Sequence, residues 1–260
     1  EMFERMLRAT RYSRRPPEFL LSHPVTESRI ADSRNRAIKY PMRQYPDALD
    51  YHLMRTRARM VHETTPQQAV ARFDSELEGD SLNYDASRYG LVLALTASAQ
   101  LERAQQVLLP LLLHSPEKIA YIIAQADIDA AAENYTTALA RLQQQLTKQP
   151  ESHALNLRYA ELLMKSGNYP LSEEVLEDHA KRRPKNDYVW YLLAEVHGLA
   201  GNILSVHTAR AEYFILNGVY DKAQTQLNNA LKLAEGNYHK TALLEERIKD
   251  IHNMREKNQL

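Results

Sequence analysis

Apolar residues recur at intervals of three and four positions along most of the chain. Ala138, Leu139, Leu142 and Leu146 form one such series between two breaks in the pattern. This spacing places the apolar side chains on one face of an α-helix, whereas a half-buried strand would require strict alternation. The breaks contain Gly, Asn or Pro, which end helices or open new ones. The pattern therefore predicts a chain of short amphipathic helices joined by tight connections.

These predicted helices repeat with a period of 34 residues. Three tight turns share the spacing, at residues 133–135, 167–169 and 201–203, and each has Asn at its centre. Other positions keep the same period: prolines at Pro116, Pro150 and Pro184, small residues at Ala126, Ala160 and Ala194 and at Ala104, Ala138 and Ser172, and leucines at Leu108, Leu142 and Leu176. Because several independent positions keep one period, the sequence indicates a repeat architecture.

A helix–turn–helix unit of 34 residues resembles the tetratricopeptide repeat. The predicted units cover residues 85–118, 119–152, 153–186 and 187–218, after a degenerate unit at about 50–84 that carries Ala69 and Phe73. A further turn at Gly218 follows Gly201 by half a period, so the helix between them is predicted to serve two units. Residues 238–257 are predicted to form a charged helix that caps the array. The predicted fold class is all-α, a tetratricopeptide-repeat solenoid of helical hairpins.

Composition narrows the classes of function. The 260 residues include 33 basic and 33 acidic side chains, and this balance argues against a nucleic-acid binder. The absence of cysteine excludes disulfides, thiolate zinc sites and cysteine nucleophiles. Only seven glycines occur, and the sequence contains neither the dinucleotide-binding glycine motif nor a P-loop. Since the chain has no apolar run of about 18 residues, we expect no transmembrane segment.

In tetratricopeptide arrays the first helix of each hairpin lines a concave groove. On this face, acidic residues recur at positions 34 residues apart, at Asp127, Glu161 and Glu195. The predicted groove residues are Tyr89, Leu93, Ile123, Asp127, Leu157, Glu161, Met164, Tyr188, Tyr191 and Glu195. Apolar and aromatic side chains with interspersed carboxylates suit an extended or unfolded polypeptide that has apolar anchors and some basic residues. The alternative is that these are ordinary surface and interface residues of a solenoid.

The first forty residues lack the repeat and contain a different motif. Residues 15–32 read Arg-Pro-Pro-Glu-Phe-Leu-Leu-Ser-His-Pro-Val-Thr-Glu-Ser-Arg-Ile-Ala-Asp. The prolines end a first predicted helix, and a second is predicted from about Thr26 to about Lys39. His23 lies in the loop between them, and Pro24 restricts the backbone on its C-terminal side. Such a loop can hold an imidazole at a fixed place.

This segment resembles the one that joins the protease and repeat domains in the family of periplasmic β-barrel assembly-enhancing zinc metalloproteases, the BepA or YfgC family. The close match covers residues 1–37, and the tetratricopeptide repeats agree in architecture over the rest. The resemblance implies that residues 1–45 are the C-terminal piece of a metalloprotease domain. It implies that residues 46–260 are the solenoid with its capping helix, and that the protein is located in the periplasm.

The resemblance also implies a regulatory role for the His-Pro loop. In the family, zinc is held by two histidines of an H-E-x-x-H motif and a downstream glutamate. A histidine that corresponds to His23 can occupy the open zinc position and hold the protease inactive. Pro24, Glu27 and Arg29 are predicted to support this loop. The alternative for His23 is a loop histidine that caps a helix.

The H-E-x-x-H motif of the family is missing from this sequence. The nearest string runs from His62 to Pro66, where proline replaces the second histidine, and Pro66 is predicted to open a helix. The chain alone is therefore predicted to be inactive, with zinc held mainly by residues outside it. His197 is predicted to pack within a hairpin or in the groove. Because the sequence starts at Glu1 rather than Met, we expect a fragment or a processed chain.

Two functions are compatible with these observations. The first is the C-terminal region of a periplasmic zinc metalloprotease and chaperone that binds unfolded or stalled outer-membrane β-barrel proteins for assembly or degradation. Its partners would be those proteins, their assembly machinery and its own protease domain, and not nucleic acid. The second is a non-enzymatic tetratricopeptide scaffold that binds a folded protein. An H-E-x-x-H motif encoded ahead of Glu1 would favour the first.

Overall fold

The computed structural model describes residues 27–40, 48–79 and 81–258. The chain divides into two compact units, Glu1–Ala48 and Leu49–Leu260. The described residues form thirteen helices and no strand, which confirms the all-α prediction. In the first unit the described element is α2 (Glu27–Ile38), which lies where a helix was predicted after the His-Pro loop.

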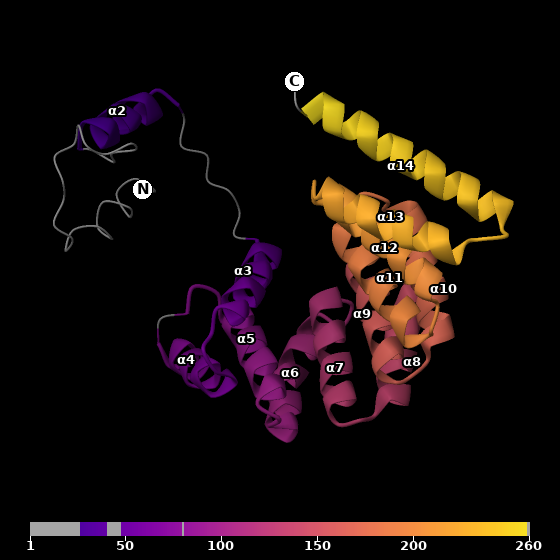
Figure 1. Ribbon diagram of the computed structural model, residues 1–260. Helices are drawn as coiled ribbons and strands as arrows, with labels where there is room; N and C mark the ends of the chain where they lie inside the picture. The colour runs from indigo at the N-terminus through magenta and orange to yellow at the C-terminus, as the bar shows by residue number, and fades with distance from the viewer. Residues whose placement is uncertain (1–26, 41–47, 80, 259–260) are drawn as a thin grey trace. The chain divides into compact units, whose positions relative to one another are not determined.

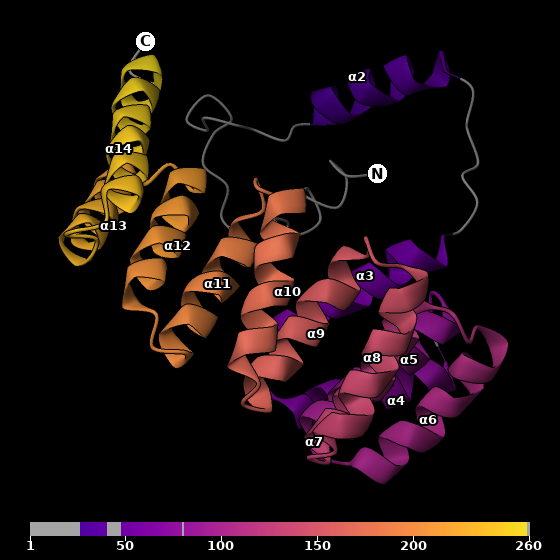
Figure 2. The same ribbon diagram turned by 90° about the vertical axis from the view of Figure 1, so that its right-hand side faces the viewer.

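The second unit is a series of antiparallel helical hairpins. Figures 1 and 2 show these helices following one another along the chain and packing side by side. The hairpins are α3 (Leu49–Val61) with α4 (Pro66–Glu78), α5 (Tyr84–Ala97) with α6 (Leu101–His114), α7 (Ile119–Ala131) with α8 (Tyr135–Lys148), α9 (His153–Lys165) with α10 (Tyr169–Arg182), and α11 (Asp187–Leu199) with α12 (Ile203–Leu216). Two further helices follow, α13 (Tyr220–Leu233) and α14 (Tyr238–Asn258). The hairpins coincide with the units predicted from the 34-residue period.

The turn inside each regular hairpin repeats one backbone geometry. Its central residue has a left-handed backbone, with φ of 59° at Ala99, 63° at Glu133, 81° at Gly167 and 80° at Gly201. The next amide donates to the carbonyl five residues earlier, as in the bond of 2.9 Å from Asn134 to Asp129. This is the Schellman arrangement, which satisfies carbonyls that the helix end would leave unpaired. The four turns therefore share one physical origin and one period.

The period halves at Gly218. This glycine has a φ of 71°, and the amide of Val219 donates to the carbonyl of Phe214 at 2.8 Å, so a fifth turn of the same geometry follows α12 directly. As predicted, α12 packs against both α11 and α13. The final helix α14 packs against α13, and Arg247 of α14 makes a bidentate ion pair with Glu212 of α12 at 2.6 and 2.7 Å. These contacts confirm the predicted capping role of the charged terminal helix.

Small side chains let the two helices of each hairpin approach closely. The predicted small and leucine positions are buried: Ala104, Ala126, Ala138, Ala160, Ala194, Leu108, Leu142 and Leu176. Ser172 takes the place of alanine at one of these positions and is fully buried. Its hydroxyl donates to the carbonyl of Ala160 at 3.0 Å, which satisfies its hydrogen-bonding need within the core.

Candidate protein-binding groove

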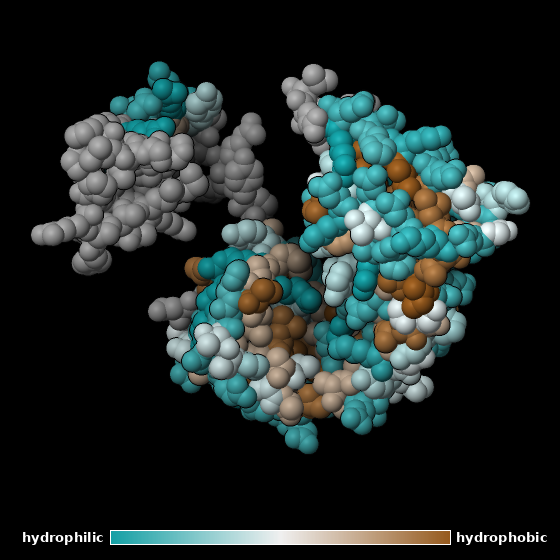
Figure 3. Space-filling model, in the orientation of Figure 1, coloured by the Kyte–Doolittle hydropathy of each residue, from teal (hydrophilic) through white to brown (hydrophobic). Residues whose placement is uncertain are grey.

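The first helices of the hairpins line a cavity of about 650 Å³. Its walls come from α3, α7, α9 and α11 and from the connections before α7 and α9, so the second helices of the hairpins take no part. This is the side of the array that the repeat grid predicted. We call this cavity the groove. The face of the unit seen in Figure 3 has polar surface interrupted by apolar patches.

The structure places most of the predicted groove residues on this side, although not in one cavity. Ile123, Leu157, Glu161 and Tyr188 line the groove itself. Leu93 and Asp127 line a neighbouring cavity of about 470 Å³ between α5, α7 and α9. Tyr191 and Glu195 are exposed on α11, where the ring of Tyr191 stacks on that of Tyr188 with centroids 5.9 Å apart.

Three predicted groove residues are buried in the core, namely Tyr89, Ile123 and Met164. Tyr89 is fully buried, so its assignment to the groove surface is wrong. Arg57 of α3 donates to its hydroxyl at 2.9 Å, and the ring of Tyr121 on α7 lies 5.9 Å away, so residues of α3 and α7 cover this position. Met164 has an exposure of 9% and packs in the core formed by α9, α10 and α11.

Sequence reasoning missed an arginine between the predicted carboxylates. Arg158 of α9 lines both cavities, and its guanidinium contacts Asp127 at 2.5 Å and Glu161 at 2.7 Å. Burial raises the pKa of Asp127, and the attraction of Arg158 opposes this rise. Asp127 and Glu161 therefore share one positive charge that the protein itself supplies. The repeat grid did not reveal Arg158, because the equivalent positions are Ala124 and Leu192.

Glu195 is the carboxylate of the predicted series that stays exposed, and it has no ion pair among the described residues. Tyr188 joins this part of the groove to α9, since its hydroxyl donates to Glu161 at 2.8 Å. Burial raises the pKa of Tyr188 to about 12, and the hydrogen bond to Glu161 acts in the same direction. The phenol is therefore neutral at physiological pH. Tyr188 and Tyr191 offer 44% and 49% of their surfaces to a ligand.

The predicted metal-regulating residues are placed only in part. His23 and Pro24 lie outside the described residues. Glu27 is the first residue of α2, and Arg29 is exposed on the same helix. Across residues 27–40, 48–79 and 81–258, no group of three or more His, Asp or Glu side chains is arranged to hold a metal ion.

The string from His62 to Pro66 is a helix boundary, as predicted. The hydroxyl of Thr65 accepts from the amide of Gln68 at 3.2 Å and caps α4, and Pro66 is the first residue of that helix. The prediction for His197 is confirmed as packing within the repeats: its side chain is buried, and Nδ1 lies 2.8 Å from a carboxylate oxygen of Glu173 on α10.

The chain is similar in sequence to known proteins. Residues 129–196 match the family model described as tetratricopeptide repeat. The chain is 29% identical over 239 residues to a putative beta-barrel assembly-enhancing protease from Vibrio cholerae and 28% identical over 257 residues to the beta-barrel assembly-enhancing protease of Escherichia coli. The chain is a homologue of these proteases. The resemblance predicted from the sequence is thereby confirmed.

The homology covers nearly all of this chain and part of each relative. The alignments cover 90% and 98% of the chain, but it spans about half the length of these curated relatives, 49% and 52%. A solved tetratricopeptide repeat protein from Parabacteroides merdae covers 96% of this chain, and the alignment spans 98% of that structure, with a TM-score of 0.45 and 16% identity. In the described part of the chain, no helix combines the length and the apolar character that a membrane span requires.

Proposed function

We propose that this chain is the client-binding region of a periplasmic zinc metalloprotease and chaperone that acts on outer-membrane β-barrel proteins. The observation that carries the proposal is the similarity, over 85–98% of the chain, to relatives named beta-barrel assembly-enhancing protease. Because the chain spans about half of these relatives, we assign the hydrolytic chemistry to the other half. Clients and assembly machinery would be bound by the repeats.

The groove supplies the chemistry for holding an extended polypeptide. The partly exposed Leu157 offers apolar surface, and the stacked rings of Tyr188 and Tyr191 form an exposed aromatic shelf. Apolar side chains of an unfolded client would pack on these residues, where most of the binding energy is expected. A basic residue of the client would pair with Glu195, the exposed carboxylate beside the shelf. Main-chain groups of an extended strand would remain solvated at the groove edge.

We assign His23 to control of the zinc site of the complete protein. The described residues do not fit a zinc site by themselves, so the other ligands would come from the longer protein. A hydrolytic zinc keeps one coordination position for water. In this proposal the imidazole of His23 occupies that position until the His-Pro loop moves, and Pro24, Glu27 and Arg29 hold the loop.

The groove assignment is tested with the full-length protein and an unfolded outer-membrane β-barrel protein as the probe. Tyr191→Ala should weaken binding by at least about fivefold, the loss expected for an aromatic anchor. Tyr238→Ala is the matched control, because Tyr238 is a 93% exposed tyrosine on α14. Glu195→Lys should weaken binding further at low salt. Equal binding by all variants would remove the groove from the proposal, and binding of a folded partner alone would favour the scaffold.

The role of His23 is tested by proteolysis. In the full-length protein, His23→Ala should increase casein hydrolysis without changing the zinc content, and His114→Ala, a change at an exposed histidine on α6, should not. Lower activity in His23→Ala would mean that the imidazole takes part in the chemistry instead. This chain alone should not hydrolyse casein.

A further inference from the structure

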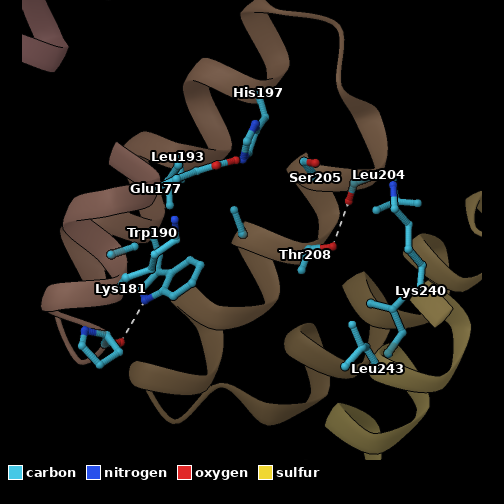
Figure 4. A pocket seen from close by; sticks show the side chains of 14 residues that line it. Glu177, Lys181, Trp190, Leu193, His197, Leu204, Ser205, Thr208, Lys240 and Leu243 are labelled. Carbon is cyan, nitrogen blue, oxygen red and sulfur yellow. Dashed lines mark hydrogen bonds between the residues drawn. The ribbon is translucent and has the colours of Figure 1, made fainter. Parts of the chain in front are cut away.

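A second cavity lies on another side of the array. It has a volume of about 550 Å³ and is lined by α10, α11, α12 and α14. Its walls are chiefly apolar, with Trp190 and Leu193 on one side and Leu204 and Leu243 on the other (Figure 4). The indole nitrogen of Trp190 donates to the carbonyl of Pro184 at 2.9 Å, which fixes the ring against this opening. We call this cavity the α14 pocket.

The α14 pocket and the groove use opposite faces of α11. Tyr188 and Tyr191 stand on the groove side, whereas Trp190, Leu193 and His197 line the α14 pocket. Residues two apart on a helix are rotated by about 200° around its axis, so these two sets diverge. A ligand in one site therefore leaves the other accessible.

The α14 pocket exists because this unit has small side chains where the preceding unit has large ones. In the preceding hairpin, leucines and a valine from α8 and α10 fill the corresponding space against α9. One period later the equivalent residues are smaller: Ala180 for Leu146, Ser205 for Leu171 and Ala209 for Val175. All three of the smaller residues line the pocket. The opening is thus specific to one repeat, and α14 forms its outer wall.

The rim of the α14 pocket is basic. Residues 181–185 read Lys-Arg-Arg-Pro-Lys, and Lys181 and Pro184 from this run line the pocket. Lys240 of α14 stands on the opposite rim and has no ion pair among the described residues. Lys181 pairs with Asp178 at 3.0 Å on the exposed surface. The carboxylate of Glu177 points toward the ring of His197 rather than out of the pocket (Figure 4). The charged residues that line the pocket are Glu177, Lys181 and Lys240, so two positive charges and one negative charge give its lining a net charge of +1.

We propose that the α14 pocket is a second protein-docking site, which takes a bulky apolar side chain from an extended acidic segment of a partner protein. The apolar walls receive the anchor, and Lys181 and Lys240 pair with carboxylates on either side of it. This preference is opposite in charge to that of the groove, where Glu195 favours basic clients. The solenoid thereby binds two different segments at once, one on each face of α11.

Trp190 is the only tryptophan of the chain, so its fluorescence reports directly on this pocket. The probe is the peptide acetyl-Gly-Asp-Asp-Phe-Asp-Asp-Gly-amide, titrated into this chain at low salt to about 1 mM, where weak sites become visible. Saturable changes in Trp190 emission are expected. Replacing Phe by Ala, or every Asp by Lys, should weaken binding at least about tenfold. No saturable change, or equal binding of the Lys peptide, would overturn the proposal.

Two variants locate the site. Ser205→Leu combined with Ala209→Val gives this unit larger apolar side chains at these positions, as in the preceding unit, and should abolish peptide binding while the circular dichroism spectrum stays helical. Lys181→Glu combined with Lys240→Glu changes only exposed side chains and should weaken binding at least about tenfold. Tyr191→Ala, on the groove side, should bind the peptide normally. If the variant with Ser205→Leu and Ala209→Val folds and still binds the peptide unchanged, the α14 pocket is not the binding site. If that variant does not fold, unchanged binding by the charge-reversed variant would overturn the proposal.

Discussion

Gly90 on α5 is predicted to tolerate no larger residue. A Cβ atom built there would lie 2.3 Å from Cε1 and from Cζ of Phe73, and 2.8 Å from its Cδ1. Phe73 is fully buried on α4, and the guanidinium of Arg72 covers its ring at 4.3 Å from the centroid. The ring therefore cannot move aside without disturbing the packing of the first two hairpins.

The two opposing energies can be compared. Alanine in place of glycine inside a helix stabilises by about 1 kcal/mol. Overpacking a close-packed core costs roughly 1–3 kcal/mol, and contacts of 2.3 Å to two ring atoms lie at the severe end. We therefore expect Gly90→Ala to lower the free energy of unfolding by about 1–2 kcal/mol. Gly198 on α11 is the matched control, because its added Cβ would meet only Val206 at 3.8 Å. Gly198→Ala should stabilise by about 1 kcal/mol.

Urea denaturation followed by far-ultraviolet circular dichroism measures both effects. The midpoint should fall for Gly90→Ala and rise for Gly198→Ala. Combining Gly90→Ala with Phe73→Leu should recover part of the loss, because the shorter side chain vacates the space. A Gly90→Ala variant as stable as Gly198→Ala would refute the packing of α4 on α5 described above.

Three further outcomes are expected. Glu133→Gly should raise the free energy of unfolding by about 1 kcal/mol, and with it the melting temperature, because glycine adopts the left-handed backbone without strain. Gly167→Ala should lower the melting temperature, and equal shifts would contradict the turn geometry. Burial lowers the pKa of His179 to about 4. The stability that comes from burying the neutral imidazole is therefore fully present above about pH 6.5, the pKa of histidine in the unfolded chain. This stability should be lost as the pH falls from there toward 4, as measured by thermal melts. The loss should be smaller in His179→Leu, where the neighbouring His153, whose pKa burial also lowers, remains. Arg158→Met should destabilise by about 2 kcal/mol by leaving half-buried carboxylates unpaired, and adding Asp127→Asn should restore part of it.

The sequence alone determined the repeat. Helix positions, the left-handed turns at Gly167 and Gly201 and the small residues between paired helices depend on local spacing and backbone freedom, which are visible in a single stretch of chain. The half period at Gly218 was equally visible. The residues around His23 also carry the resemblance to the assembly-enhancing proteases, with which the sequence comparisons agree.

Only the tertiary structure decided which predicted groove residues meet solvent and which charges remain unpaired. Tyr89 is covered by Arg57, 32 positions earlier, and Asp127 is paired with Arg158, 31 positions later. Both contacts join different repeats, and neither arginine recurs at the equivalent position of the neighbouring repeats. A search for periodic residues therefore does not predict these contacts. The α14 pocket has the same origin, because its volume depends on four helices whose side chains are small at one repeat only. Packing between repeats depends on which two side chains meet, whereas the 34-residue period shows only which residue type stands at each position.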